Sequence, residues 1–370
     1  MQIYPDFGTS FFVSALVSSE CLIKTILSYA ESWVISISLL PNPQPLKEEF
    51  TMSQIRILAN DGIDDAGKAM LEAAGFNVVT THYKAEELPG ILKSFDAITV
   101  RSATQVRKEL IDACPNLKAI GRGGVGMDNI DVAYAREKGL GVYNTPAASS
   151  RSVAELVFTH ILTLMRQMHT ANRAMPARGQ TDFGKLKKQC SEGFEVLGKT
   201  IGIIGFGRIG QEVARIALGL GMHVMATDPF VKEAIVEIKV QGATETIKAH
   251  IKTTDIQNLF AGADMITIHI PMADKPLIGK DELILLKPGV LLINTARGGV
   301  FDEDAILEGL ASGQIGGAGI DVYVGEPTPR MEILTHSKIS LSPHIGGSTA
   351  EAQENVGKEL AQLLINHFKA

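Results

Sequence analysis

The stretch Thr200-Ile201-Gly202-Ile203-Ile204-Gly205-Phe206-Gly207-Arg208-Ile209-Gly210 decides the fold of this 370-residue chain. Its apolar beginning is typical of a buried parallel strand, and glycines then interrupt it before a helical pattern starts. Four apolar positions of that pattern fall on one helix face: Ile209, Val213, Ile216 and Ala217. The stretch therefore predicts a strand, a tight turn and a helix in immediate succession.

The spacing of the glycines predicts what this turn binds. We expect Gly205 to make the turn, Gly207 to let a pyrophosphate approach the backbone, and Gly210 to let the helix pack closely on the strand. The free N–H groups of a helix start also favour phosphate oxygens. A second apolar run over 223–227 ends in Asp228, where a carboxylate would bind the ribose hydroxyls and repel a 2′-phosphate. A glycine turn alone is weak evidence, but together with Asp228 it predicts a site for NAD rather than NADP.

Composition narrows the class of protein. The chain is 45% hydrophobic and 21% charged, with 36 glycines, which is typical of an α/β protein long enough for two domains. Its formal net charge is -6 and no basic stripe is present, so we expect no nucleic-acid partner. The densest basic segment, Lys185-Leu186-Lys187-Lys188, is either a solvated loop or a phosphate contact. Cys21, Cys114 and Cys190 lack the spacing of a metal site or a disulfide framework, so we expect no metal and a cytoplasmic location.

Residues 1–51 differ in composition from the rest of the chain. They are rich in Ser, Phe, Ile and Leu, and Met52 directly precedes the first strand-like run. We interpret them as a disordered extension or a start-site artefact, with translation beginning at Met52. A membrane anchor or targeting peptide is the alternative. It is disfavoured because the first charge is Asp6, and because Glu20, Lys24 and Glu31 interrupt the apolar run, so no membrane association is expected.

Strand and helix patterns alternate between 55 and 143. Strands are expected over 55–59, 77–80, 97–100, 119–120 and 141–143, and helices over 66–74 and 108–113. This alternation predicts an open, mostly parallel sheet, in which ligands bind at the carboxyl ends of the strands. Arg101, Ser102 and Arg122 follow two of these strands, and we expect them to bind an anionic substrate, because guanidinium binds carboxylate or phosphate bidentately. Two ordinary surface arginines are the alternative.

A long helix separates the two halves of the chain. Ser152-Val153-Ala154-Glu155 reads as a capping box that starts this helix, which continues to about Met168. We expect a substrate domain of residues 52–150 plus 337–370 and a nucleotide-binding domain of residues 151–336. The predicted fold class is thus α/β, with two Rossmann-like domains that have open parallel sheets and an active-site cleft between them. His160 and His169 are interpreted as packing or surface histidines.

The second half delivers an arginine, an acid and a histidine at successive strand ends. Strands are expected over 265–270, 290–293 and 316–321, with helices over 302–310 and 350–369. Arg297, Glu326 and His344 follow such strands. A histidine can take the hydroxyl proton while hydride leaves for a nicotinamide, an acid can orient the imidazole, and an arginine can bind the carboxylate. The predicted reaction is therefore hydride transfer at a carbinol carbon.

These motifs resemble the D-isomer-specific 2-hydroxyacid dehydrogenases over essentially all of 53–370. The shared motifs are the glycine turn with Asp228, Asn294-Thr295-Ala296-Arg297-Gly298-Gly299, Asp321-Val322 followed by Glu326-Pro327, and Pro343-His344-Ile345-Gly346-Gly347. The resemblance implies that Arg297, Glu326 and His344 are catalytic and that Asp321 meets the nicotinamide carboxamide. It also implies a set of residues around the NAD cofactor: Val125, Gly205, Gly207, Arg208, Ile209, Gly210, Asp228, Ile270, Thr295, Ala296, Arg297, Asp321, His344, Ile345, Gly346 and Gly347.

Within the family, the segments 100–104, 121–129 and 346–353 look most like those of members that oxidise D-3-phosphoglycerate in serine biosynthesis. This implies a phosphorylated 2-hydroxy acid held by Arg101, Ser102 and Arg122, with Ser149 at a position where bacterial relatives carry a substrate-contacting asparagine. It also implies a homodimer. The chain ends shortly after His344, so we expect no feedback inhibition through a C-terminal regulatory domain. The alternatives are a glyoxylate/hydroxypyruvate reductase, a D-lactate dehydrogenase and, more remotely, an NAD-sensing corepressor-like scaffold.

Overall fold

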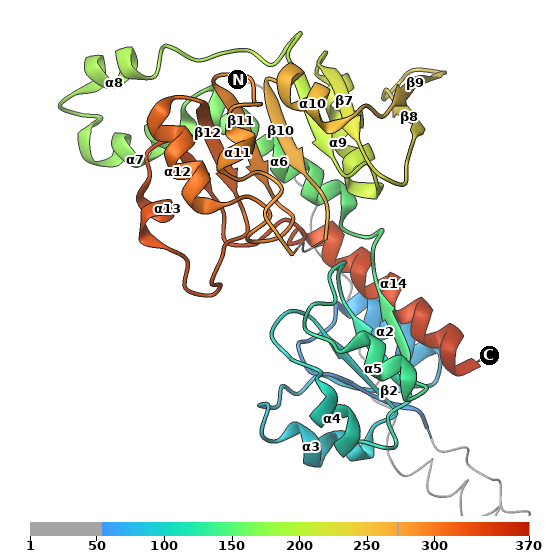
Figure 1. Ribbon diagram of the computed structural model, residues 1–370. Coiled ribbons are helices and arrows are strands. Elements are labelled where there is room, and N and C mark those ends of the chain that lie inside the picture. Colours follow the sequence, from blue (N-terminus) through green and yellow to red (C-terminus); the bar gives the residue numbers. More distant parts are fainter. Residues whose placement is uncertain (1–53, 272–273, 370) are drawn as a thin grey trace, which may run out of the picture. The chain divides into compact units, whose positions relative to one another are not determined.

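The computed structural model describes residues 54–271 and 274–369 (Figure 1). The expectations for residues 1–51 therefore lie outside the described part of the chain. The described residues form α/β structure with two separate parallel sheets, as predicted. Among the described helices, none is long and apolar enough to cross a bilayer.

The first sheet holds five parallel strands in the order β2-β1-β3-β4-β5. These are β1 (Arg56–Ala59), β2 (Asn77–Val79), β3 (Ala97–Val100), β4 (Ala119–Arg122) and β5 (Gly141–Asn144). The connecting helical segments are α2 (Asp65–Ala73), α3 (Leu88–Ile91), the 3-10 turn η1 (Leu92–Ser94), α4 (Lys108–Ala113) and α5 (Val132–Glu137). All five expected strands are confirmed to within two residues, because each is a short apolar run bounded by turn residues.

The final helix packs against this first sheet, as the sequence predicts. Helix α14 (Ala350–Lys369) buries Leu360, Ala361 and Leu364 in the same apolar cluster as strand residues of β1, β3 and β4. It lies so close to α2 that a Cβ on Gly67 would come within 2.5 Å of the Gly357 carbonyl. The C-terminal segment is thus part of the first half's core.

The second sheet holds six parallel strands in the order β13-β12-β11-β10-β6-β7. Its strands are β6 (Thr200–Ile204), β7 (His223–Thr227), β10 (Met265–Ile268), β11 (Val290–Asn294), β12 (Ile315–Ile320) and β13 (Ile339–Leu341). Its helices include α9 (Arg208–Gly219), α10 (Ile256–Gly262), α11 (Lys280–Leu283), α12 (Glu303–Ser312) and α13 (Met331–Thr335). The strand order reverses between β6 and β10, and such a switch point opens a crevice at the carboxyl ends of the strands.

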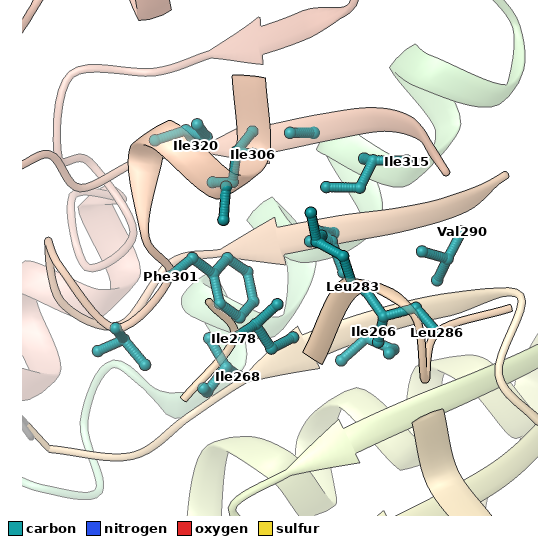
Figure 2. Packing of buried hydrophobic residues seen from close by; sticks show 14 of the residues in the cluster. Ile266, Ile268, Ile278, Leu283, Leu286, Val290, Phe301, Ile306, Ile315 and Ile320 are labelled. Carbon is teal, nitrogen blue, oxygen red and sulfur yellow. The ribbon is translucent and has the colours of Figure 1, made fainter. Parts of the chain in front are cut away.

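The core of this sheet is almost entirely aliphatic. Ile266 and Leu292 of its central strands are fully buried and belong to one apolar cluster with Phe301 and Ile306. Figure 2 shows Ile266, Phe301 and Ile306 of this cluster. Strands buried on both faces read as continuous apolar runs, which is why the sequence predicts them well. β13 pairs in parallel with β12, so the sheet extends beyond the expected domain boundary at residue 336.

The helix between the two sheets begins earlier than predicted. Helix α6 (Ser150–Met165) follows Ser149, which occupies the N-cap position without a side-chain cap. Ser152 lies inside the first turn and its hydroxyl donates to the Ser149 carbonyl, so the proposed capping box is wrong. Glu155 is instead paired with Arg151 one turn away. The local four-residue pattern was misleading because a serine can also bond back to its own helix.

Two features of the second half were not predicted. Helices α7 (Met168–Arg178) and α8 (Phe183–Gln189) follow α6, and Leu186 is the one residue of α7 and α8 that is buried. After β7 comes an antiparallel hairpin, β8 (Glu233–Lys239) and β9 (Thr246–Lys252). The alternation of Ala234, Val236 and Ile238 on the inward side of β8 is a period-2 signal that the sequence does carry.

Candidate active site

The glycine turn after β6 has the geometry expected of a pyrophosphate site. Gly205 adopts a φ of 89°, and a Cβ there would lie 2.5 Å from the His269 carbonyl oxygen. A Cβ on Gly210 would lie 2.2 Å from the Gly205 carbonyl oxygen, so the close helix–strand packing expected of Gly210 is confirmed. Gly207 faces open space and caps α9, whose start has no side-chain hydrogen bond among the described residues. The turn thus leaves room and donors for a dinucleotide phosphate.

Asp228 stands at the end of β7 and closes this turn. One carboxylate oxygen accepts the N–H of Phe206 at 2.7 Å, and the other accepts those of Phe230 and Val231 at 2.8 and 2.9 Å. Partial burial acts to raise the pKa of Asp228, but these backbone hydrogen bonds outweigh it and hold the pKa below its usual value. The predicted ribose-binding acid therefore also fixes the glycine turn.

Arg297 follows β11 in a turn held by its neighbours. The side chain of Asn294 accepts the N–H of Ala296 and donates to the Arg297 carbonyl. The guanidinium donates from Nε to Asp128 at 2.9 Å and from Nη1 to the Ala296 carbonyl at 2.7 Å. Gly126 lets it approach, because a Cβ there would lie 1.6 Å from Nη2. Its remaining N–H donors can bind a substrate carboxylate.

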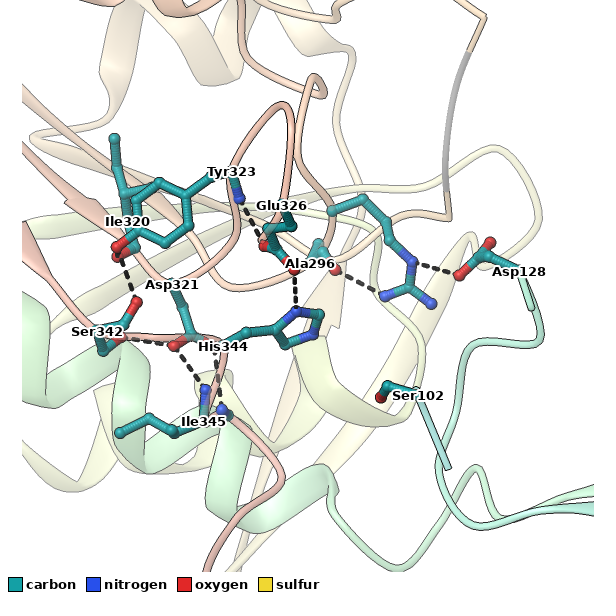
Figure 3. A network of polar contacts seen from close by, with 12 residues as sticks. Ser102, Asp128, Ala296, Ile320, Asp321, Tyr323, Glu326, Ser342, His344 and Ile345 are labelled. Carbon is teal, nitrogen blue, oxygen red and sulfur yellow. Dashed lines mark hydrogen bonds and ion pairs between the residues drawn. The ribbon is translucent and has the colours of Figure 1, made fainter. Parts of the chain in front are cut away.

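Asp321 directly follows β12 and holds the turn that carries His344 (Figure 3). Its carboxylate accepts the N–H groups of Ile345 at 2.9 Å and Gly346 at 3.0 Å, and the hydroxyl of Ser342 at 2.6 Å. Its carbonyl accepts the N–H of His344 at 2.8 Å. Asp321 is 1% exposed. Its expected contact with the cofactor stays a prediction, and its contacts here already set the shape of the turn.

The structure brings two of the predicted catalytic residues, His344 and Glu326, into direct contact. Nδ1 of the imidazole lies 2.8 Å from Oε2 of Glu326, and the other carboxylate oxygen accepts the Tyr323 N–H at 2.8 Å (Figure 3). The His344 side chain is half-exposed. Since Nδ1 faces the acid, Nε2 is the nitrogen available to a substrate hydroxyl. This arrangement can move a proton at Nε2.

Arg101, Ser102 and Arg122 lie at the carboxyl ends of β3 and β4. The Arg122 guanidinium donates to the Gly123 carbonyl at 2.9 Å and to Ser102 Oγ at 3.4 Å. Burial, followed by the positive charges of Arg297 and Arg101, lowers the pKa of Arg122 to about 10. Its Nε is buried without a partner in the described part of the chain. Three cations with an unused buried donor are suited to an anion.

The remaining predicted residues lie in varied surroundings. Ser149 is buried beside Gly347, and a Cβ added to Gly347 would lie 3.4 Å from the Cβ of Ser149. Val125 is partly exposed, and its carbonyl accepts from Asn144 at 2.7 Å. Lys185 lies on α8 and pairs with Asp182, so the basic segment is helical rather than a loop. The other predicted cofactor residues follow strands or begin α9: Arg208, Ile209, Ile270, Thr295 and Ala296.

Sequence reasoning missed several residues that shape the site. Asp128 binds Arg297, Tyr323 positions Glu326 through its N–H, and Ser342 binds Asp321. Tyr323 also donates its hydroxyl to the Ser342 carbonyl, and burial raises the pKa of this phenol to about 12. Asp128 lies in the segment 121–129 and Ser342 directly precedes the motif that begins at Pro343, so an acid or a hydroxyl close to a predicted site residue was the available signal.

The family of the chain follows from comparison with known proteins. The D-isomer specific 2-hydroxyacid dehydrogenase NAD binding domain matches residues 158–346. The chain belongs to the D-isomer specific 2-hydroxyacid dehydrogenase family, whose members are NAD-dependent oxidoreductases. The open phosphate turn and the Asp228 carboxylate fit NAD.

Individual relatives differ in what they act on. The chain is 39% identical over 323 residues to the hydroxypyruvate reductase of Thermotoga maritima, which covers 86% of this chain and 99% of that protein. It is 38% identical over 310 residues to the D-3-phosphoglycerate dehydrogenase of Methanocaldococcus jannaschii, covering 83% of this chain but 56% of that protein. The solved NAD-dependent formate dehydrogenase of Staphylococcus aureus in complex with NAD is 28% identical, with a TM-score of 0.67, covering 85% and 95% of the two chains.

Proposed function

We propose that the chain oxidises D-3-phosphoglycerate at C2 to 3-phosphohydroxypyruvate with NAD, the first committed step of serine synthesis. The observation that carries this proposal is the grouping of Arg101, Arg122 and Arg297, in which the Nε of Arg122 is buried without a partner in the described part of the chain. A substrate with a carboxylate at one end and a phosphate at the other supplies the negative charge that these cations lack. A substrate without phosphate would leave part of that charge uncompensated.

The acids near these arginines compensate them poorly. Asp61 already accepts the N–H groups of Arg101 and Thr104 and the Thr104 hydroxyl. Asp128 is engaged with Arg297 and is mostly exposed, which screens its charge. Burial is the first cause of the lowered pKa of Arg122, and the positive charges of Arg297 and Arg101 lower it further. An incoming dianion would relieve that repulsion.

The proposed catalytic roles follow from the contacts of Arg297, Glu326 and His344. His344 takes the C2 hydroxyl proton at Nε2, and Glu326 at Nδ1 stabilises the imidazolium that results. Arg297 binds the substrate carboxylate with the donors that Asp128 and Ala296 do not use. Bound NAD supplies the hydride acceptor. The glycine turn would hold its pyrophosphate and Asp228 its ribose hydroxyls.

Reduction of hydroxypyruvate or glyoxylate is the second candidate. The Thermotoga maritima hydroxypyruvate reductase matches over 99% of its own length, which favours this candidate. Unphosphorylated substrates need one anion site rather than two, so Arg101 would then contribute little. D-lactate oxidation makes the same prediction, and a scaffold without turnover would process none of these compounds.

Steady-state kinetics of an Arg101→Ala variant separate these candidates, with Arg136→Ala on α5 as the control for loss of an exposed arginine. The proposal expects kcat/KM for D-3-phosphoglycerate to fall about a hundredfold, with kcat/KM for hydroxypyruvate nearly unchanged. Equal kcat/KM values in Arg101→Ala and wild type for the phosphorylated substrate would reject the proposal. We also propose a cytoplasmic homodimer and the division into a substrate domain and an NAD domain, with the second boundary moved past β13.

A further inference from the structure

A buried hydrogen-bond chain runs from α6 to the turn that carries His344. His160 is 2% exposed and lies between two serines of the segment around β13, with Nδ1 2.9 Å from Ser340 Oγ and Nε2 3.0 Å from Ser342 Oγ. Ser342 Oγ in turn donates to Asp321 Oδ1 at 2.6 Å. Helix α6 comes very close here, since a Cβ on Gly319 would lie 2.6 Å from His160 Cβ.

The donor and the acceptor of each hydrogen bond in this series can be assigned. A hydroxyl has one proton, and Ser342 gives its proton to Asp321, so it must accept from His160. Nε2 of His160 therefore carries the proton. Burial lowers the pKa of His160 to about 4, which keeps the ring neutral, so Nδ1 accepts from Ser340. With this one tautomer of His160, both ring nitrogens and both serine hydroxyls of the series have a hydrogen-bond partner.

At its far end, this series of hydrogen bonds reaches the backbone turn that carries the proposed base, His344. His344 has a φ of 54°, an unfavourable conformation for a residue with a side chain, and it persists where neighbours fix it. Asp321 fixes it through the N–H groups of His344, Ile345 and Gly346. If Ser342 lost its partner, it could rotate away and leave Asp321 with one bond fewer.

We propose that His160 is a positioning residue that orients Asp321 through Ser342 and thereby holds the His344 turn in its active shape. The inference rests on the proposed role of His344 as the base. The role requires a hydrogen-bond donor at the position of Nε2, because Ser342 accepts there. Gln can place a donor near the Nε2 position, whereas Asn reaches the Nδ1 position alone.

The test compares His160→Leu, His160→Gln and His160→Asn. His169→Leu is the control, because it makes the same substitution at a histidine outside this hydrogen-bond series. His160→Leu and His160→Asn should lower kcat about tenfold and weaken NADH binding about threefold, with KM for the hydroxy acid within about twofold. His160→Gln should restore both values to near wild type. Activity of His160→Leu within about twofold of wild type, or equal values for the Gln and Asn variants, would overturn the proposal.

A spectroscopic measurement tests the same series of hydrogen bonds without any substrate. In wild-type protein labelled with ¹⁵N-histidine, long-range ¹⁵N–¹H spectra should show His160 as the neutral tautomer protonated on Nε2, identified by the signal missing from His160→Gln. A proton on Nδ1 would overturn the proposal, even if His160→Leu fails to fold. NADH binding and the tautomer are independent of phosphoglycerate turnover, so failure of the proposed function is distinguishable from failure of this one.

Discussion

Nδ1 of His344 lies 2.8 Å from Oε2 of Glu326, and this contact fixes which imidazole nitrogen can face a substrate. His344→Ala should therefore remove the proton acceptor and lower kcat by about a thousandfold. NADH binding should stay largely intact, because the glycine turn is the part predicted to bind the pyrophosphate. The measurement is turnover together with NADH binding by fluorescence. Substantial residual kcat with intact NADH binding would exclude His344 as the base.

Glu326→Gln should lower kcat by about a hundredfold while the protein stays folded. The amide keeps the size of the side chain but carries no charge to stabilise the imidazolium form of His344. The Tyr323 N–H still finds an oxygen, so thermal unfolding should change little. A kcat equal to that of wild type would show that the charge of Glu326 does not assist His344 during turnover.

Gly210→Ala should destabilise the protein and abolish NADH binding. The added Cβ would lie 2.2 Å from the Gly205 carbonyl oxygen, so the glycine turn would have to move. Gly219→Ala, at the other end of α9, is the matched control, because nothing lies within 4 Å of a Cβ there. Thermal unfolding and NADH titration of both variants provide the comparison. Equal behaviour of the two would contradict the close packing of the turn on α9.

Asp228→Ala should relax the preference for NAD over NADP by about tenfold or more in the ratio of the two kcat/KM values. The variant should also lose some stability, because Asp228 accepts three backbone N–H groups of the turn region. A variant that binds NADH well and still strongly rejects NADP would remove Asp228 from the ribose site.

The pKa of His160 predicts a pH dependence of stability. Its folded value of about 4 lies below the ordinary value of 6.5, so the unfolded chain binds the proton first as pH falls. Stability is then complete above about pH 6.5 and decreases toward pH 4, by at most about 3 kcal/mol. His160→Gln should flatten this decrease in urea unfolding measured at several pH values. An unchanged pH slope would show that His160 does not stay neutral in the fold.

The parts of the fold that depend on short runs of sequence were predictable. The strand, turn and helix around Gly205 follow from local apolar periodicity and from the steric needs of glycine. The pairing of Asp128 with Arg297 joins residues far apart in the chain, and no periodicity announces it. His160 shows the same limit. Its position on a buried helix face indicates packing, but its hydroxyl partners around β13 emerge from the tertiary structure.

A substrate panel with the purified chain tests the central claim most directly. D-3-phosphoglycerate, hydroxypyruvate, glyoxylate and D-lactate would each be assayed in its own direction with the NAD or NADP couple, and compared by kcat/KM. The account predicts the highest value for D-3-phosphoglycerate with NAD, because three neighbouring arginines favour a substrate with two anionic ends. A higher value for any unphosphorylated 2-hydroxy or 2-keto acid would contradict it.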